Sequence, residues 1–361
     1  MSGMLYTLTQ RLLPWIGASP MQIPNVYLFS SKELLRMAAS AAGGTLGWES
    51  GFYKGYGQFR GIYLSIVDPF MGEVARELTH EYVHFLVGEA APGVDIPAWV
   101  NEGLATYLEF HSGVEFGTGL PAQREMFGSA DMVKERLDAG TLIPLSRLVS
   151  QKEWNSQTDE RLVGLQYSEA YMAVRYLLER FGQRAVGLLL QELKAEQTFE
   201  AAFQRVTGIT LAQFEQDWLA WLRTWRDDVR EQIRRYVSQV DALFTDINAI
   251  DDDRKKFIDT CGRCPYSQRI GPQTQFVERA SSVESRARAL SAPGLVEEFH
   301  SQLLAFVASY KRLLQKELDA YRLQNNTMID EASAMIPEVN GRWDRVWRAL
   351  YDIKFNWRLK E

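Results

Sequence analysis

The pattern of apolar and polar residues at positions 24–66 predicts the strands of a small sheet and one helix. Residues 24–29 form a short apolar run that is typical of a strand. Ser30, followed three residues later by Glu33, is a capping box, and it predicts a helix that ends at Gly43-Gly44. The stretch from there to Ile66 is rich in Gly, Tyr and Phe, which favours two further strands joined by turns.

Helical periodicity takes over from residue 71. One helix is expected at about residues 71–88, and Pro97 opens a second that runs to about His111. Residues 112–165 are rich in loop-forming residues, and we expect them to form a wall of a substrate cleft. Further helices are predicted at about residues 165–181, 184–196 and 198–206, and again after a capping box at 210–213.

The composition changes at about residue 226, where long helical patterns begin and continue to the end of the chain. They predict an antiparallel helical bundle. The expected fold class is therefore α+β and mostly helical, with an N-terminal α/β part at residues 1–70, a helical part at 71–225 and a C-terminal helical bundle at 226–361. A chain of 361 residues with 46% hydrophobic content is long enough for two such domains.

Charge and hydropathy argue against two classes of partner. The net charge of −6 disfavours a nucleic-acid partner, because non-specific binding to phosphates needs basic patches. No apolar run reaches the roughly 18 residues of a membrane span, so no transmembrane segment is expected. The first residues make a poor signal peptide, since they lack a long apolar core before a cleavage site. The protein is therefore expected to be cytoplasmic by default, or exported if this chain lacks its leader.

The most informative motif is the string HEYVH at residues 80–84. Two histidines four apart on a helix share one face, so His80 and His84 can bind one metal ion from consecutive turns. Glu81 lies beside them, where it could take a proton from water. The alternative is a chance HExxH pattern on an ordinary helix. Against it stands the scarcity of histidine, because two of the four in the whole chain fall in this motif.

A third ligand is needed to fix the ion and leave one position open. Glu102 is the candidate, in the segment WVNEGLATY. It lies 18 residues after His84 (102 − 84 = 18), which is far enough for the first helix to end, a loop to return and a second helix to present it.

At these residues the chain resembles the gluzincin zinc metallopeptidases, and most closely the aminopeptidase-type branch with its bacterial peptidase MA-like relatives. Those proteins carry HExxH and then a NEG(F/L)A-type segment, here residues 101–105. The resemblance covers roughly residues 55–225. It implies a thermolysin-like catalytic core, Zn²⁺ held by His80, His84 and Glu102, and hydrolysis of peptide bonds by a zinc-activated water with Glu81 as general base.

The resemblance includes a tyrosine later in the chain, but a glutamate that the family carries before the zinc helix has no counterpart here. Tyr167 opens the segment YSEAYMAVRYLLERFG and corresponds to the phenol that would stabilise an oxyanion, although Tyr171 and Tyr176 are nearby alternatives. Aminopeptidases of this branch also carry a strand whose Glu holds the substrate's free amine. By the resemblance, the stretch 55–64 is expected to be the equivalent edge strand. It contains no Glu, and Gln58 is the nearest counterpart. Aminopeptidase specificity is therefore in doubt.

Other polar residues admit both a functional and a structural reading. Glu73, Glu77 and Glu109 could orient an imidazole by accepting its second N–H, or could belong to a solvated acidic face. The two remaining histidines are expected to be structural. They are His111, at a helix end, and His300, among apolar neighbours.

The pair Cys261–Cys264 forms a CxxC motif without the thioredoxin-like βαβ context of a redox protein and without two further cysteine ligands for zinc. A short-loop disulfide, or two inert thiols in a turn, is the expected reading.

The sequence therefore predicts a zinc-dependent metallopeptidase acting on a peptide or protein substrate. An inactive protein of the peptidase fold, serving as a binding or scaffold module, is the alternative, because fold does not imply function. A metalloenzyme acting on a non-peptide amide or ester is a third reading. The bundle could support the catalytic part or dock a protein partner, and the sequence does not choose between these roles.

Overall fold

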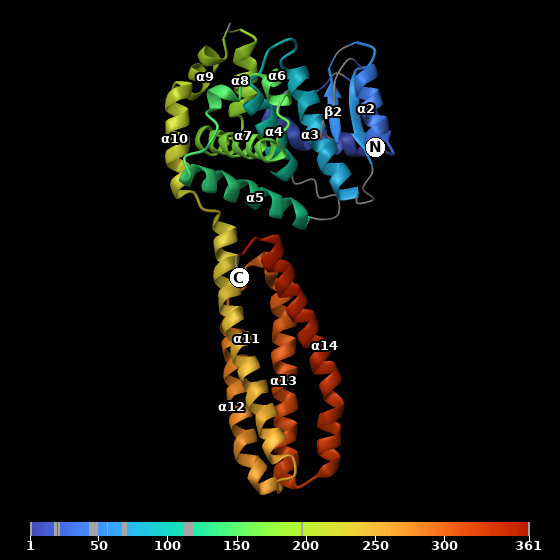
Figure 1. The fold of residues 1–361 in the computed structure, drawn as a ribbon, viewed down its shortest axis with the longest axis vertical. Coiled ribbons are helices and arrows are strands. Elements are labelled where there is room, and N and C mark those ends of the chain that lie inside the picture. The colour runs from blue at the N-terminus through green and yellow to red at the C-terminus, as the bar shows by residue number, and fades with distance from the viewer. Residues whose placement is uncertain are drawn as a thin grey trace. The chain divides into compact units, whose positions relative to one another are not determined.

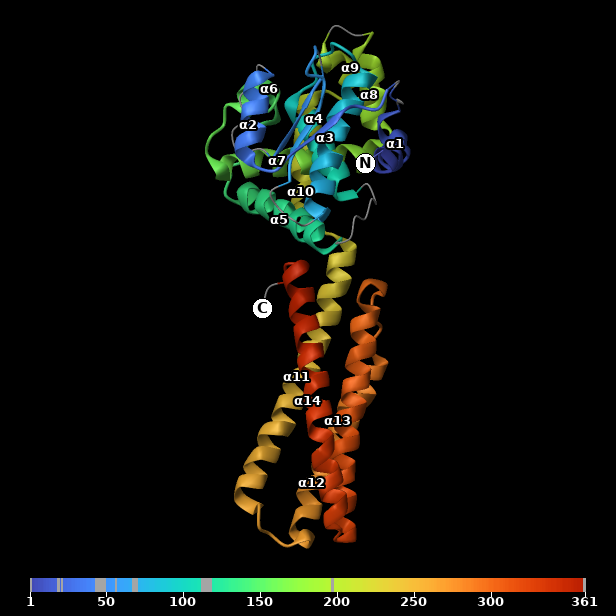
Figure 2. The ribbon, with the colours of Figure 1, turned by 90° about the vertical axis from the view of Figure 1, so that its right-hand side faces the viewer.

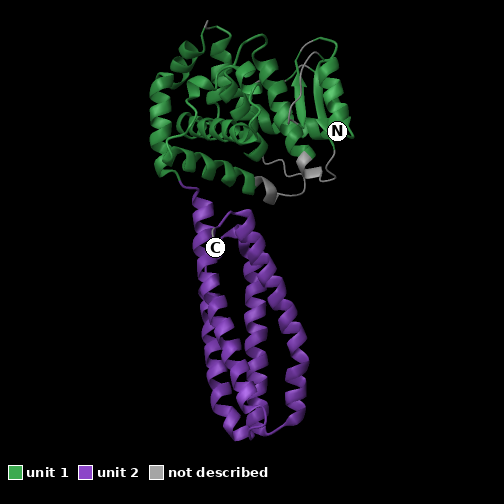
Figure 3. Cartoon of the chain, in the orientation of Figure 1, with its two compact units in different colours: residues 1–225 green, residues 226–361 purple. Residues whose placement is uncertain are grey.

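The computed structural model describes residues 2–17, 20, 22–42, 50–55, 57–66, 71–111, 119–195 and 198–359. It is mostly helical, with one small sheet near the N-terminus (Figure 1). The chain forms two compact units, Met1–Trp225 and Arg226–Glu361 (Figure 3). Within the described residues, no helix is both long and apolar enough to cross a membrane.

The sheet of the first unit has three strands in the order β1-β3-β2 among the described residues. They are β1 (Val26–Phe29), β2 (Gly51–Lys54) and β3 (Gly61–Ser65). The central strand β3 is buried along its whole length, runs parallel to β1 and is antiparallel to β2. Strand β2 is therefore an edge of the sheet.

Helices build most of the first unit. The described helices are α1 (Ser2–Ile16), α2 (Lys32–Ala41), α3 (Met71–Ala90), α4 (Ala98–His111), α5 (Gly119–Asp138), α6 (Gln151–Asn155), α7 (Glu160–Phe181), α8 (Ala185–Leu193), α9 (Phe199–Thr207) and α10 (Leu211–Thr224). Helix α3 packs against both β2 and β3, and α4 packs against α3 and α7. Helix α4 thus lies between α3, which contacts the sheet, and the long buried helix α7.

Caps explain several of the helix starts. Ser31 accepts a hydrogen bond from the amide of Leu34 and begins α2, one residue after the Ser30 that the capping-box pattern indicates. Helix α2 ends at Ala41, and Gly43-Gly44, its expected end, lies outside the described residues. Thr210 caps α10 in the same way, as its capping box predicts.

Two sequence expectations for the middle of the first unit are wrong. Residues 112–165 are not mainly loop, because α5 and α6 occupy much of the described part, while 112–118 lie outside it. The buried residues of α5 follow helical spacing, but the glycine and charged residues between them make that spacing hard to recognise in the sequence. These buried residues are Met126, Phe127, Ala130 and Val133. Helix α7 begins at Glu160 and not near 165, since Asp159 accepts the amides of the first turn.

The second unit consists of four long helices (Figure 2). They are α11 (Asp228–Cys261), α12 (Tyr266–Ala289), α13 (Glu297–Leu323) and α14 (Asn326–Asn356). Each helix packs on the next one along the chain. Their apolar faces bury a continuous core that includes Val240, Phe244, Leu303, Phe306 and Leu314. Helical spacing of apolar residues accounts for this arrangement.

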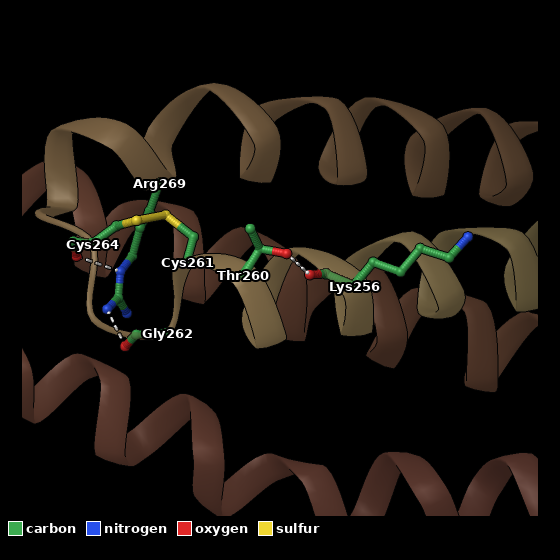
Figure 4. The surroundings of a disulfide bond; sticks show 6 residues. All are labelled: Lys256, Thr260, Cys261, Gly262, Cys264 and Arg269. Atoms are coloured by element: carbon green, nitrogen blue, oxygen red, sulfur yellow. Dashed lines mark hydrogen bonds between the residues drawn. A yellow bond between two sulfur atoms is a disulfide. The ribbon is translucent and has the colours of Figure 1, made fainter.

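Cys261 and Cys264 form a disulfide in the turn between α11 and α12 (Figure 4). The guanidinium of Arg269 donates to the carbonyl of Cys264 at 2.9 Å and to that of Gly262 at 2.7 Å. The turn is therefore closed both covalently and by hydrogen bonds to its carbonyls. Of the two alternatives that the sequence leaves open, a short-loop disulfide and two inert thiols, the structure has the disulfide.

Candidate metal centre

Side chains of α3 and α4 bring three donor atoms to one point. His80 and His84 lie on consecutive turns of α3, and Glu102 lies near the start of α4. The Nε2 atom of each histidine is 3.4 Å from the same carboxylate oxygen, Oε2 of Glu102. All three donor atoms lie within 4.8 Å of one another. These residues could therefore hold a single metal ion.

The donor set fits zinc in its chemistry and in the two distances from Glu102 to the histidines. Two imidazoles and one carboxylate form the His₂Glu set of catalytic zinc sites, which keep a fourth position open. Tetrahedral ligands about 2.0–2.1 Å from an ion are about 3.3 Å from each other. The observed 3.4 Å separations from Glu102 to His80 and to His84 match that requirement.

Both imidazoles are oriented through their other nitrogen. His80 donates from Nδ1 to Oε2 of Glu109 at 3.2 Å, and His84 donates from Nδ1 to Oδ1 of Asn101 at 3.0 Å. Arg76 in turn donates to Glu109 from Nε at 3.0 Å. When the ring is neutral, a proton held on Nδ1 leaves the lone pair on Nε2, the nitrogen that a metal ion at this point would bind.

The structure thus distinguishes among the acidic residues proposed to orient an imidazole. Glu109 contacts His80, whereas Glu77 accepts a hydrogen bond from Ser50. The side chain of Glu73 lies outside the described residues. Sequence reasoning missed the role of Asn101, although it stands next to Glu102 in the quoted motif.

The other two histidines lie apart from this cluster. His111 is hydrogen-bonded through Nε2 to the hydroxyl of Tyr171 at 3.1 Å. His300 belongs to the second unit, where its Nδ1 is 3.0 Å from the hydroxyl of Tyr236.

Glu81 is buried between the helix and the sheet, with 6% of its surface exposed. Burial raises its pKa to about 7, although the charges of His84 and His80 oppose the shift. A Cβ atom placed on Gly51 would lie 3.2 Å from Cγ of Glu81. The start of the edge strand β2 therefore approaches this side chain closely.

Glu102 and His84 shift each other's pKa in opposite directions. Burial alone would raise the pKa of Glu102, but the charge of His84 and the hydrogen bonds of both histidines lower it overall. Burial would lower the pKa of His84, and the charge of Glu102 and the hydrogen bond to it raise it overall. This mutual stabilisation is what convergent donor atoms produce in a buried site.

The expected edge strand at residues 55–64 is wrong. Residues 61–65 form the central strand β3, and the edge strands of the described sheet are β1 at residues 26–29 and β2 at residues 51–54. Gln58, the counterpart of the amine-binding glutamate, is exposed in the turn between the two strands. The turn at Gly57, where φ is +73°, places Gln58 outside both strands.

Of the three candidate tyrosines, Tyr167 lies against the metal cluster. Its ring centroid is 6.1 Å from that of His80. Tyr171 is bound instead to His111 and accepts a hydrogen bond from Arg175. Tyr176 accepts one from Arg180 and packs on Phe214 and Trp221. Tyr167 stands in the third turn of α7 and not at the helix start that the sequence indicated.

The segment from Ile143 to Gln151 connects this cluster to α7 and α10. Both carboxylate oxygens of Glu169 accept from the amide of Ile143, at 2.9 and 3.1 Å. Glu215 accepts from the amide of Leu145 at 2.8 Å. At the far end of the segment, Gln151 donates to Oε1 of Glu102 at 2.8 Å. The segment therefore reaches a candidate metal ligand, and sequence reasoning did not predict this contact.

Glu169 makes the stability of the first unit depend on pH. Burial raises its pKa from 4.5 to about 8, against the hydrogen bond from Ile143. Between these two values the unfolded chain ionises while the folded chain keeps its proton. The free energy of unfolding therefore falls as pH rises, with a slope approaching about 1.4 kcal/mol per pH unit from this group.

Urea unfolding of the wild type and of Glu169→Gln at pH 5 and pH 8 measures this effect. The variant is expected to gain stability relative to the wild type at the higher pH, because its amide still accepts from Ile143 and never ionises. Exposed Glu160 lies on the same helix, so Glu160→Gln is the control. A stability difference between Glu169→Gln and the wild type that stays constant with pH would contradict the assignment.

The comparisons with known proteins identify one family. The family described as Peptidase MA superfamily matches residues 11–224, which is more than half of the chain. This range contains the sheet, the HEYVH helix, Glu102 and the segment that ends at Gln151. No curated protein and no solved structure matches the chain significantly. The extent of the family match shows that the chain belongs to the Peptidase MA superfamily.

Proposed function

We propose that this protein is a zinc-dependent peptidase in which His80, His84 and Glu102 hold the ion. The observation that carries the proposal is the approach of both histidine Nε2 atoms to one oxygen of Glu102 at 3.4 Å. When bound, zinc lowers the pKa of water and polarises a carbonyl. Membership of the Peptidase MA superfamily supports peptide bonds as the target.

Glu81 is proposed as the general base and then the general acid. Its charge interacts with those of His84 and His80, and its side chain lies against Gly51 at the start of strand β2. There it takes a proton from the attacking water and later gives that proton to the leaving amine. Its burial keeps bulk water from competing for the same proton.

The edge strand β2 is proposed to bind the substrate. A peptide in extended form can add to an exposed sheet edge through main-chain hydrogen bonds. The strand begins at Gly51, which lies against Glu81, so a peptide aligned on β2 passes the proposed base. Because Gln58 lies in an exposed turn, nothing at that position holds a free amine, and we propose no aminopeptidase specificity.

Tyr167 is proposed to donate a hydrogen bond to the oxyanion of the tetrahedral intermediate. Tyr167→Phe is expected to lower kcat about 10²–10³-fold with little change in KM, as for the loss of one oxyanion donor. Tyr171→Phe, on the same helix, is the comparison, because its hydroxyl is bound to His111 and Arg175. Steady-state kinetics decide the matter: an unchanged kcat in Tyr167→Phe would remove the residue from the mechanism.

A library of internally quenched peptides tests the proposed activity. The wild type should cleave some of them, lose the activity with a chelator and regain it when zinc is restored. Simple amide and ester substrates are assayed in parallel. Their hydrolysis without cleavage of any peptide would favour a metalloenzyme that acts on non-peptide substrates. Zinc binding without cleavage of any substrate would favour the inactive binding or scaffold module.

A further inference from the structure

The side-chain amide of Gln151 is held in one orientation. Its nitrogen Nε2 donates to Oε1 of Glu102 at 2.8 Å and to Oδ1 of Asn155 at 3.0 Å. An amide NH₂ has two hydrogens, so each of these acceptors takes one. The flipped amide would set a carbonyl oxygen against two other acceptor oxygens. Gln151 therefore serves Glu102 as a donor.

This hydrogen bond divides the two oxygens of Glu102 between different partners. Oε1 accepts from Gln151, whereas Oε2 is the oxygen that faces Nε2 of both His80 and His84. Glu102 is buried, with 5% of its surface exposed, so bulk water does not take the place of Gln151 at Oε1. Any partial rotation of the carboxylate out of its present plane would break the bond to Gln151, whereas a half-turn only exchanges two equivalent oxygens and restores the same arrangement.

Gln151 is in turn fixed relative to the helix that carries Glu102. The amides of Ala98 and Trp99, at the start of α4, donate to the carbonyls of Val149 and Leu148 at 2.8 and 2.9 Å. These bonds use amides that a helix N-terminus leaves without intrahelical partners. The segment that presents Gln151 is thus attached to the first turn of α4, just before Glu102.

We propose that Gln151 is a positioning residue that holds Glu102 so that one carboxylate oxygen, Oε2, serves the metal ion. This inference rests on the proposed function, because it presupposes zinc at His80, His84 and Glu102. Its effect is exerted through Glu102, and Gln151 itself touches neither the ion nor a substrate. Partners of this kind commonly change metal affinity 10–100-fold when they are removed.

Zinc affinity of purified full-length chains, measured by competition with a chromophoric chelator, tests the inference. Gln151→Leu removes the donor, and zinc affinity is expected to fall about 10–100-fold. Gln151→Glu keeps nearly the same shape but turns a carboxylate toward Glu102, so the loss should be at least as large. The matched control is Gln213→Leu, since Gln213 also donates to a side chain four residues on, in α10.

Cobalt(II) gives a second readout that packing alone does not change. Its visible absorption reports the ligand set, so the spectrum should shift in both Gln151 variants and match the wild type in Gln213→Leu. Thermal unfolding shows whether each variant is folded. If Gln151→Leu does not fold, the near-isosteric Gln151→Glu still tests the inference.

The two ways of failing are distinguishable. Wild-type zinc affinity and cobalt spectrum in folded Gln151 variants, with one zinc bound by the wild type, would overturn this inference and leave the proposed function standing. A wild-type chain that binds no zinc would overturn both.

Discussion

Replacement of Glu81 by glutamine is expected to leave zinc binding nearly unchanged and to lower peptide hydrolysis about 10²–10⁴-fold. The amide has almost the same shape as the carboxyl, and the donor atoms of His80, His84 and Glu102 do not include it. A glutamine amide at position 81 cannot accept a proton from water at neutral pH. Binding of the ion and turnover should therefore separate in this one variant.

The matched control for Glu81→Gln is Glu77→Gln, four residues earlier on the same face of α3. Glu77 accepts a hydrogen bond from Ser50, which a glutamine oxygen can also accept. Zinc content is measured by elemental analysis, and hydrolysis with the best peptide of the library. Full activity in Glu81→Gln would exclude Glu81 as the base, while loss of zinc would assign it a structural role.

A second large effect is expected from a single methyl group at Gly103. A Cβ atom there would lie 2.4 Å from the carbonyl oxygen of Ala170 and 2.7 Å from Cγ2 of Val174. The nearest atom belongs to the backbone of α7, so no side chain can move away to relieve the clash. Gly103→Ala must separate α4 from α7, at a cost of at least about 1–3 kcal/mol of stability.

Because Gly103 follows Glu102 directly, the same displacement should weaken zinc binding. The control is Gly164→Ala in α7, where the nearest atom to an added Cβ is the end of the Met132 side chain at 3.9 Å. That substitution is expected to be neutral or to stabilise the chain by about 0.5–1 kcal/mol through helix propensity. Urea unfolding and zinc titration of both variants give the comparison. Equal stability of Gly103→Ala and Gly164→Ala would contradict the close approach of α4 and α7.

The parts of the site that the sequence could predict are those governed by local geometry. The four-residue spacing of His80 and His84 determines that they share a helix face, whatever surrounds the helix. The place of Glu102 does not follow from helix geometry alone, because a loop separates its helix from that of the histidines. The family resemblance, through the segment at residues 101–105, identifies it as the third ligand. The structure brings the donor atoms of all three residues together.

Contacts between distant segments could not be predicted in the same way. Gln151 lies 49 residues after Glu102 (151 − 102 = 49), in a segment that reads as loop and has no motif of its own. Its place depends on the carbonyls of Leu148 and Val149 meeting the start of α4, which is a tertiary contact. The role of Asn101 was missed for a related reason, since the side chain reaches back to a different helix.

Errors in the secondary structure have similarly specific causes. The start of α7 was placed too late because Tyr167 matched a family pattern, whereas Asp159 caps the helix eight residues earlier. Strand β2 is only four residues long, and the register with β3 is not visible in the pattern of Gly and aromatic residues. The second unit was easier, since long helices repeat the same apolar spacing many times.

The most direct test of the account is zinc stoichiometry across the four histidines of the chain, each replaced by alanine. Wild type, His111→Ala and His300→Ala are expected to bind one zinc ion per chain, and His80→Ala and His84→Ala to lose it, with far-UV circular dichroism confirming the fold of each variant. One zinc per chain in folded His80→Ala or His84→Ala, or none in the wild type, would contradict the central claim that these two histidines and Glu102 form a zinc site.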